Sequence, residues 1–398
     1  MKKILFIYPS MFIGGSTTAL LAYLNSINSE QYEVDLQLMR HDGPLMGEIP
    51  KHVRVLPAAE RYRGICGRVI KLGICLFKGY FIKAIGKGLK RRKWISRAVI
   101  ADFQAKELCN KNEKHYDYAV GFLEGWANRY VAYCVEADKK YAWIHSMFHK
   151  TTTDAQAELS WMNEVDKIAF VADACREDFE AAMPEVAQKA ITIENITDIN
   201  LIRQRSMQID EKDEAYKIFV ESKQFKIVTV CRLIIAVKGL DRIVACAAAL
   251  KQKGHKFLWY IIGDGADEKE LQEMIANSRV EDCLCAIGKR TNPYPFMAAA
   301  DIMCMPSRYE GKPLAVTESM ILGVPPVVTA YASAEEQIQN NVDGIVVNND
   351  DTAIINAVEK CITMPDTAQK MHLNLIEKDY SNSGDITVIE KAFCEGNI

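Results

Sequence analysis

SRYEGKPLAVTESMILGVPPVVT, residues 307–329, is the stretch that decides the fold of this chain. Pro313 stands where the first turn of a helix tolerates a missing N–H, and the apolar residues after it recur at helical spacing. Gly323 and the two prolines behind it end that helix, and the residues VVT then read as a buried strand. The stretch therefore predicts a loop, a helix, a break and a strand.

The start of this helix is a candidate anion-binding site. Backbone N–H groups and the positive end of the helix dipole favour negative charge there. Glu310 stands just before the helix and Glu318 lies within it, so two carboxylates bracket the site. This arrangement suits an anionic ligand with hydroxyl groups at both ends. Each glutamate also has an ordinary explanation, in which Glu310 complements the dipole and Glu318 is a helix charge that is solvated or lies in the N-terminal half of the helix.

Strand and helix patterns alternate through both halves of the chain. Strands are predicted at residues 4–8, 34–39, 53–56, 116–122, 141–144, 166–172 and 190–194, and after a polar connector at 227–231, 257–262, 283–287 and 302–305. In the second half, helices are predicted at residues 239–253, 268–277 and 294–299. This alternation is typical of two doubly wound α/β domains with mostly parallel strands, and the connector at 196–224 marks their boundary.

Composition narrows the class of protein. A length of 398 residues favours two domains, and a net charge of -3 gives no global attraction to nucleic acid or membrane. The twelve cysteines are scattered without a CxxC, which indicates reduced core residues and a cytoplasmic location. The opening MKKILFIYPS reads as a first strand, because its apolar run is too short for a signal peptide. No apolar run approaches the ~18 residues that span a bilayer.

Residues 61–97 differ from the rest of the chain. They contain twelve Lys or Arg residues and no Asp or Glu, interleaved with aliphatic and aromatic side chains. A basic amphipathic surface suits an anionic membrane leaflet or a lipid diphosphate. The alternative is a solvated helix whose apolar side packs on its own domain.

Three other places carry candidate ligand contacts. Gly14-Gly15-Ser16 form a turn between a strand and a helix, which suits a phosphate but is also common in plain βα turns. His145 directly follows a strand, and the carboxyl ends of parallel strands are where such sheets bind ligands. A structural histidine is the alternative there. Arg232 and Lys238, in RLIIAVKGL, can reach one diphosphate from a loop or can be unrelated surface charges.

Together these motifs resemble the retaining glycosyltransferases of family 4, which have the GT-B fold. The strongest match is the EX7E element from Glu310 to Glu318, accompanied by VCRLIIAVKGLDRIV, YIIGDGADEKELQ, AIGKRTNPYPFMAAADIMCMPS and EEQIQNNVDGIVV. The resemblance covers the C-terminal half almost end to end. The N-terminal half is similar through shorter segments, FIGGSTTALL, FLEGWANRY, AWIHSMFHK and IENITDIN. These segments look like those of bacterial capsule, exopolysaccharide or cell-wall transferases.

The resemblance implies a role for each matching residue on the donor side. Glu318 would accept hydrogen bonds from the ribose hydroxyls, and Glu310 would hold the hydroxyls of the donor sugar. Arg232 and Lys238 would neutralise the diphosphate as the leaving group gains charge. Pro313 would line the sugar-diphosphate without offering an N–H. Its neighbours Gly311, Lys312 and Leu314 would line it through their backbones.

Further roles follow from the same resemblance. Lys289 and Arg290 would lie where the base is held, and His145 would stand near the reacting carbon. Gly14, Gly15 and Ser16 form the glycine turn, where Gly15 lets the first helix approach the diphosphate from the other domain. Asn195 marks the end of the N-terminal domain.

The resemblance also implies an architecture and an activity. The expected fold is α/β with two doubly wound Rossmann-like domains facing across a cleft. Residues 1–200 would bind the acceptor, residues 201–377 the nucleotide-sugar, and residues 378–398 would form a helix crossing back to the N-terminal domain. The enzyme would move a hexosyl or N-acetylhexosaminyl group from a nucleotide-sugar, with UDP favoured by family frequency, to a saccharide or lipid-linked acceptor.

The expected setting is bacterial surface polysaccharide synthesis in the cytoplasm, at the inner face of the plasma membrane. No DxD occurs in the chain, which favours a reaction without metal or other cofactor. The sequence departs from the family at residues 234–237, where IIAV replaces small polar and acidic residues, and at GGST in the glycine turn. These departures leave the diphosphate loop and the acceptor contacts open.

Other functions remain alternatives at this point. A GT-B epimerase or phosphorylase shares the architecture, and a nucleotide-sugar-binding subunit without catalysis would use nearly the same residues. An NAD-dependent dehydrogenase requires GxGxxG after a strand, with an acidic residue about twenty positions later, and this unit is missing from the sequence.

Overall fold

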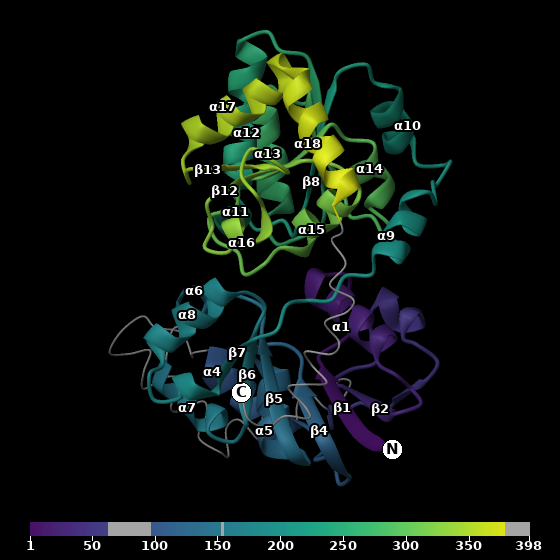
Figure 1. The fold of residues 1–398 in the computed structure, drawn as a ribbon, viewed down its shortest axis with the longest axis vertical. Helices are drawn as coiled ribbons and strands as arrows, with labels where there is room; N and C mark the ends of the chain where they lie inside the picture. The colour runs from purple at the N-terminus through teal and green to yellow at the C-terminus, as the bar shows by residue number, and fades with distance from the viewer. Residues whose placement is uncertain (63–96, 153–154, 379–398) are drawn as a thin grey trace. The chain divides into compact units, whose positions relative to one another are not determined.

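The computed structural model describes residues 1–62, 97–152 and 155–378 (Figure 1). The chain divides into two compact units, one formed by Met1–Ile196 and one that begins at Thr197. Most of the predicted basic segment 61–97 and all but the first residue of the predicted crossing helix 378–398 lie outside the described residues. The predictions for those two segments therefore stay predictions.

The first unit is built on a seven-stranded parallel sheet with the order β3-β2-β1-β4-β5-β6-β7. Its strands are largely buried because helices cover both faces of a parallel sheet, as the apolar run of the first strand indicates. They are β1 Lys2–Tyr8, β2 Tyr32–Leu38, β3 Val53–Val55, β4 His115–Gly121, β5 Glu136–Ile144, β6 Lys167–Phe170 and β7 Ala190–Thr192.

The helices of this unit follow its strands in sequence. They are α1 Gly15–Ser26, α4 Arg97–Leu108, α5 Trp126–Cys134, α6 Phe148–Thr151, α7 Ala155–Met162 and α8 Asp173–Ala182, with two 3-10 turns, η1 Pro44–Glu48 and η2 Ala187–Lys189. The main core lies between the sheet and α5, α7 and α8, where Trp161, Phe170 and Phe179 are almost completely buried.

The second unit has a six-stranded parallel sheet with the order β10-β9-β8-β11-β12-β13. Its strands are β8 Phe225–Val230, β9 Phe257–Ile262, β10 Leu284–Gly288, β11 Ile302–Met305, β12 Pro326–Thr329 and β13 Ile345–Val347. Separate apolar clusters cover the two faces of this sheet. The unit therefore has a core of its own.

Helices connect the strands of the second unit and enclose its sheet (Figure 1). They are α9 Ile199–Ser206, α10 Glu214–Glu221, α11 Ile235–Lys238, α12 Leu240–Gln252, α13 Glu268–Asn277, α14 Tyr294–Ala298, α15 Leu314–Ile321, α16 Ala334–Gln337, α17 Asp351–Thr363 and α18 Pro365–Glu377.

Each sheet reverses its strand order beside its first strand. In the first unit the chain moves outward through β2 and β3 and then returns to place β4 on the other side of β1. In the second unit β9 and β10 lie on one side of β8, and β11 lies on the other. Open parallel sheets bind ligands outside the carboxyl ends of the strands at such reversals. The loops that follow β1, β4, β8 and β11 are therefore the places to search for a site.

The predicted two-domain α/β fold with parallel sheets is confirmed, and β9, α13 and β11 have the predicted bounds. Two local predictions were wrong. Residues 234–237 were predicted to lie in a loop, but Ile235–Lys238 form the short helix α11. Strand β5 begins at Glu136, five residues before the predicted start, because its charged first half pairs with β4.

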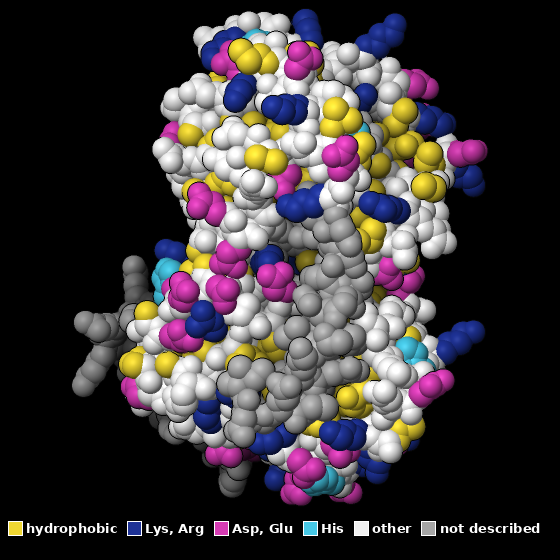
Figure 2. Space-filling model, in the orientation of Figure 1, with side chains coloured by type: hydrophobic (Ala, Val, Ile, Leu, Met, Phe, Trp, Pro, Cys, Tyr) yellow, Lys and Arg dark blue, Asp and Glu magenta, His cyan; other side chains and the backbone are white. Residues whose placement is uncertain are grey.

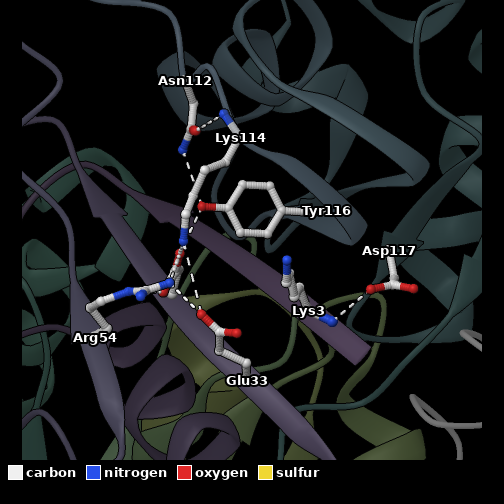
Figure 3. Close-up of polar contacts among 8 residues, drawn as sticks. Lys3, Glu33, Arg54, Asn112, Lys114, Tyr116 and Asp117 are labelled. Atoms are coloured by element: carbon white, nitrogen blue, oxygen red, sulfur yellow. Dashed lines mark hydrogen bonds and ion pairs between the residues drawn. The ribbon is translucent and has the colours of Figure 1, made fainter. Parts of the chain in front are cut away.

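The side chains of Arg54, Lys114 and Tyr116 come together in the first unit (Figure 3) and share one buried carboxylate partner. Asp35 of β2 is 1% exposed and accepts hydrogen bonds from Arg54 of β3 at 2.7 and 2.9 Å. It also accepts from Tyr116 of β4 at 2.7 Å and from Lys114 at 3.2 Å. Burial pushes its pKa upward, but these partners outweigh that effect and hold the pKa of Asp35 below its ordinary value.

Across the described ranges, none of the helices has the length and apolar character required to cross a membrane.

Candidate functional site

Glu310 and Lys238 meet at the strand reversal of the second unit. Lys238 ends α11, which follows β8, and Glu310 lies in the loop after β11. Lys238 Nζ donates to Glu310 Oε1 at 2.7 Å and to Oε2 at 2.9 Å. The two side chains are 18% and 9% exposed. The structure therefore brings a cation and a carboxylate, both predicted as site residues, to the edge where parallel sheets bind ligands.

The loop that carries Glu310 is fixed by hydroxyl groups. Ser307 Oγ donates to Glu310 Oε1 at 2.6 Å, and Thr329 Oγ1 at the end of β12 donates to the Ser307 carbonyl. Ser333 Oγ donates to the carbonyl of Gly311. Ser307 and Ser333 were not among the predicted site residues, although Ser307 begins the quoted stretch three residues before Glu310. Glu310 is therefore positioned from two neighbouring strands.

Because it has no side chain, Gly239 allows the loop after β8 and the loop after β11 to pack closely beside Lys238 and Glu310. Its φ is +65°, a left-handed conformation that favours glycine, and it separates α11 from α12. A Cβ at this position would lie 2.2 Å from the carbonyl oxygen of Pro306. A side chain here would force the two loops apart.

Glu318 is buried in α15. It is 8% exposed, and its Oε1 accepts a hydrogen bond from the Tyr294 hydroxyl at 3.0 Å. Burial raises the pKa of Glu318 to about 7, and the hydrogen bond from Tyr294 opposes that rise. The alternative of a solvated helix charge is therefore wrong. Tyr294 was not predicted as a site residue, since a tyrosine in an apolar helix reads as core.

The remaining predicted residues of this domain lie along the same edge of the sheet. Arg232 follows β8 and is exposed. Lys289 and Arg290 follow β10, where Lys289 Nζ donates to Asp264 Oδ2 at 2.8 Å and Arg290 Nε donates to Asp213 Oδ2 at 2.5 Å. Both cations thus have carboxylate partners within their own unit. Lys312 and Leu314, at the start of α15, are half-buried, and the residue before them, Gly311, is buried.

In the first unit, the predicted glycine turn follows β1. Gly14 is extended and precedes α1, which begins at Gly15. The Ser16 hydroxyl lies 2.7 Å from the Tyr8 hydroxyl at the end of β1. The turn therefore follows β1, which is one of the two strands at the reversal of the first sheet.

His145 follows β5 in the first unit, as predicted. Its Nε2 lies 3.1 Å from the carbonyl oxygen of Phe122, and its backbone N–H donates to Glu124 Oε2 at 3.1 Å. Burial lowers the pKa of His145, and the charge of Glu124 offsets only part of that effect. Because a carbonyl only accepts, Nε2 of the neutral ring carries the proton and Nδ1 is left as an acceptor.

Glu124 was missed by the sequence-based prediction, although it lies in the quoted segment FLEGWANRY, three residues after the end of β4. It accepts from the Ser146 hydroxyl at 2.9 Å as well as from the backbone of His145. Asn195 is buried one residue before the end of the first unit.

The described residues contain no group of three or more His, Cys, Asp or Glu side chains that could hold a metal ion. The expectation of a reaction without metal stays a prediction.

Comparison with known families gives one match. Residues 210–378 match the family described as Glycosyl transferases group 1. The amylovoran biosynthesis glycosyltransferase AmsK of Erwinia amylovora is 32% identical over 141 residues, which are 33% of this chain and 34% of that protein. The N-acetyl-alpha-D-glucosaminyl L-malate synthase of Bacillus anthracis is 26% identical over 166 residues, 40% of this chain and 41% of that protein. The alignments thus span well under half of these relatives.

Solved structures resemble the whole chain. The structure of Anabaena HepE in complex with UDP and glucose has a TM-score of 0.69 at 17% identity and covers 99% of this chain and 100% of that one. Sucrose-phosphate synthase from Thermosynechococcus elongatus has a TM-score of 0.69 at 14% identity, with 99% of each chain covered. At such identities the likeness shows the fold alone, which is the two-domain α/β fold of GT-B proteins. The matched segment, residues 210–378, carries the Lys238–Glu310 pair and Glu318 and is similar to the group 1 glycosyl transferases.

Proposed function

We propose that this protein is a glycosyltransferase that moves a sugar from a nucleotide-sugar to a saccharide or lipid-linked acceptor. The observation that carries the proposal is the Lys238–Glu310 pair at the strand reversal of a group 1 domain, with the buried Glu318 eight residues further along. A cation and a carboxylate at this edge match the diphosphate and the hydroxyls of a nucleotide-sugar.

Each end of the donor has a partner of suitable chemistry. Glu318 would accept from the ribose hydroxyls, and Glu310 would accept from the hydroxyls of the donor sugar. Lys238 has three donors and a carboxylate has about four lone-pair sites, so their contact leaves capacity for a ligand on both side chains. Arg232 would join Lys238 in neutralising the diphosphate, and Lys289 and Arg290 would lie beside the base.

The proposed reaction retains the configuration of the transferred sugar. The bond from the anomeric carbon to the phosphate oxygen breaks, and the bond to the acceptor oxygen forms on the same face. The departing phosphate takes the proton of the acceptor hydroxyl. Both glutamates are assigned to binding the donor, so neither is the nucleophile. A covalent glycosyl-enzyme trapped at Glu310, or a product of inverted configuration by NMR, would contradict this mechanism.

The comparisons support particular substrates. Structures of HepE hold UDP with glucose and hold UDP-glucose, and several relatives are named for amylovoran, O-antigen or colanic acid biosynthesis. By analogy, the donor would be a UDP-hexose or UDP-N-acetylhexosamine and the product a bacterial surface polysaccharide. The reaction would need no metal, because cations and the α15 dipole would stabilise the leaving group.

The acceptor would be presented at the inner face of the plasma membrane, with the basic segment 61–97 contacting anionic lipid. Nucleic acid is not a proposed partner. Figure 2 shows basic and acidic side chains interspersed over the described part of the face in view, and the net charge of the chain is -3.

A panel of UDP-, GDP- and ADP-sugars tests the proposal. A selective donor should raise the melting temperature and release free sugar slowly without any acceptor. Stabilisation without any sugar release, with or without an added acceptor, would favour a non-catalytic binding subunit. Conversion of the donor to its epimer would favour an epimerase. A panel with no effect on either measurement would overturn the proposal.

A further inference from the structure

The buried contact between Tyr294 and Glu318 suggests how one carboxylate of the site is held. Tyr294 begins α14, just after β10, and Glu318 lies in α15. Both side chains are buried, at 6% and 8% exposure, and the hydroxyl of Tyr294 lies 3.0 Å from Glu318 Oε1. An ionised carboxylate only accepts, so the phenol is the donor. One oxygen of Glu318 is therefore bound within the protein.

The apolar surroundings of this pair strengthen its hydrogen bond. The ring of Tyr294 belongs to an apolar cluster with Met320 and Phe296, so water competes little for its hydroxyl. Loss of a donor to a buried charged group costs more than loss of a neutral hydrogen bond. Without Tyr294, Glu318 would either bind a proton or turn away from its present position.

We propose that Tyr294 is a positioning residue for the donor: it holds one oxygen of Glu318 in the charged form and leaves the other for the ribose hydroxyls. The inference rests on the proposed function, since it assigns Glu318 to the nucleotide. Tyr294 acts through Glu318 and does not itself touch the reacting atoms.

The contact also makes nucleotide binding depend on pH near neutrality. Burial raises the pKa of Glu318 to about 7, and Tyr294 opposes the rise. A carboxylate forms stronger hydrogen bonds with hydroxyls than its protonated form does. Affinity for the nucleotide should therefore fall as the pH drops through about 7. Removal of the phenol hydroxyl should raise this pKa further and move the transition to higher pH.

Charged and titratable groups also lie on the helices that pack against α15. Burial and the charge of Glu318 raise the pKa of Tyr294. The charge of Arg205 in α9 offsets part of that rise. His372 of α18 lies at the far end of α15, where its Nδ1 is 2.6 Å from the carbonyl of Gly323. The adjoining strands β11 and β12 read IMCM and PVVT and carry no carboxylate or cation.

The experiment titrates UDP into the full chain between pH 6 and 8.5. The wild type should bind with a midpoint near pH 7. Tyr294→Phe keeps the ring and should bind about tenfold more weakly at pH 7, with recovery at higher pH. In kinetics it should raise the donor KM more than it lowers kcat. Glu318→Gln should bind weakly and lose the pH dependence. Tyr260→Phe, in the same apolar cluster, is the matched control and should resemble the wild type.

The outcomes separate the two proposals. A wild type that binds none of UDP, GDP and ADP contradicts the proposed function itself. A wild type that binds UDP while Tyr294→Phe shows the same affinity at every pH contradicts the positioning role alone. Weaker binding of Tyr294→Phe by the same factor at all pH values would also overturn it, since a purely structural defect has no reason to follow the protonation of Glu318.

Discussion

Both oxygens of Glu310 accept hydrogen bonds from Lys238, and one of them also accepts from Ser307. This side chain is therefore aligned by its own protein and needs no ligand to order it. Such alignment lowers the cost of binding hydroxyl groups.

Glu310→Gln and Lys238→Ala should each lower sugar transfer by about 100-fold or more, because each removes a charge that acts on the donor as the leaving group departs. Both variants should still fold, since the side chains lie at the edge of the sheet. Initial rates of transfer, with circular dichroism as the check on folding, measure the effect. Glu318→Ala should instead act chiefly on the KM for the donor. Wild-type kinetics in all three would contradict the site.

Asp35, which accepts hydrogen bonds from Arg54 and Tyr116, should make the first unit sensitive to acid. Its pKa is lowered in the folded protein, so its stabilisation is present above the unfolded pKa of about 4 and is lost as the pH falls through the folded value. Asp35→Asn should cost about 1–3 kcal/mol at pH 7 and progressively less toward pH 3. Urea unfolding at several pH values measures this difference.

The control for Asp35 is Asp138→Asn. Asp138 pairs with His115, and both side chains are more than half exposed, so its loss should change the free energy of unfolding by less than about 1 kcal/mol. A destabilisation by Asp35→Asn that stays constant from pH 7 to pH 3 would show that the charge of Asp35 is not what stabilises the strands.

At the scale of helices and strands, Gly239 is the point where α11 and α12 meet under the β11 loop. Gly239→Ala should destabilise the second unit by about 2–4 kcal/mol, from the left-handed backbone and from the close approach to Pro306. It should also lower transfer activity, because the Lys238–Glu310 pair lies beside it.

Gly254→Ala is the matched control for that substitution. Gly254 has a φ of +83°, but a Cβ there would meet no atom within 4 Å, so only the backbone term of about 1 kcal/mol applies. Equal losses of stability in the two variants, measured by urea unfolding, would show that the contact with Pro306 is unimportant.

Much of the fold could be predicted because the apolar runs and the polar or turn-forming residues between them indicated the same element bounds. Strand β9 is FLWYII between polar residues, and its bounds follow from the sequence alone. Strand β5 could not be bounded in this way, since EADKK is polar and enters the sheet only through its pairing with β4. The helix α11 was missed because IAVK spans a single turn, which carries no periodic signal.

The candidate site was predicted in part for a similar reason. Glu310 and Lys238 stand in recognisable motifs, and the structure brings them together across 72 positions of sequence. The hydrogen bonds of Ser307, Tyr294 and Glu124 depend on tertiary packing. A serine, a tyrosine or a glutamate beside a loop has many ordinary roles, so its partner cannot be named before the fold is known.

For the whole molecule, two units with separate sheets and separate cores should not unfold as one. Calorimetry should resolve two transitions. UDP should shift only the transition of the unit that begins at Thr197. At a hundredfold excess over its Kd, UDP should raise the free energy of unfolding of that unit by about 2.7 kcal/mol. A single transition that moves as a whole with UDP would show instead that the two units unfold together.

The central claim is that the edge of the second sheet, at the ends of β8 and β11, holds a nucleotide-sugar. Hydrogen–deuterium exchange of the full chain with saturating UDP tests it most directly. The account predicts slower exchange in residues 231–240 and 307–320, which carry Lys238, Glu310 and Glu318. Protection confined to residues 1–62 and 97–152, or saturation by UDP with unchanged exchange in both of these loops, would contradict the claim.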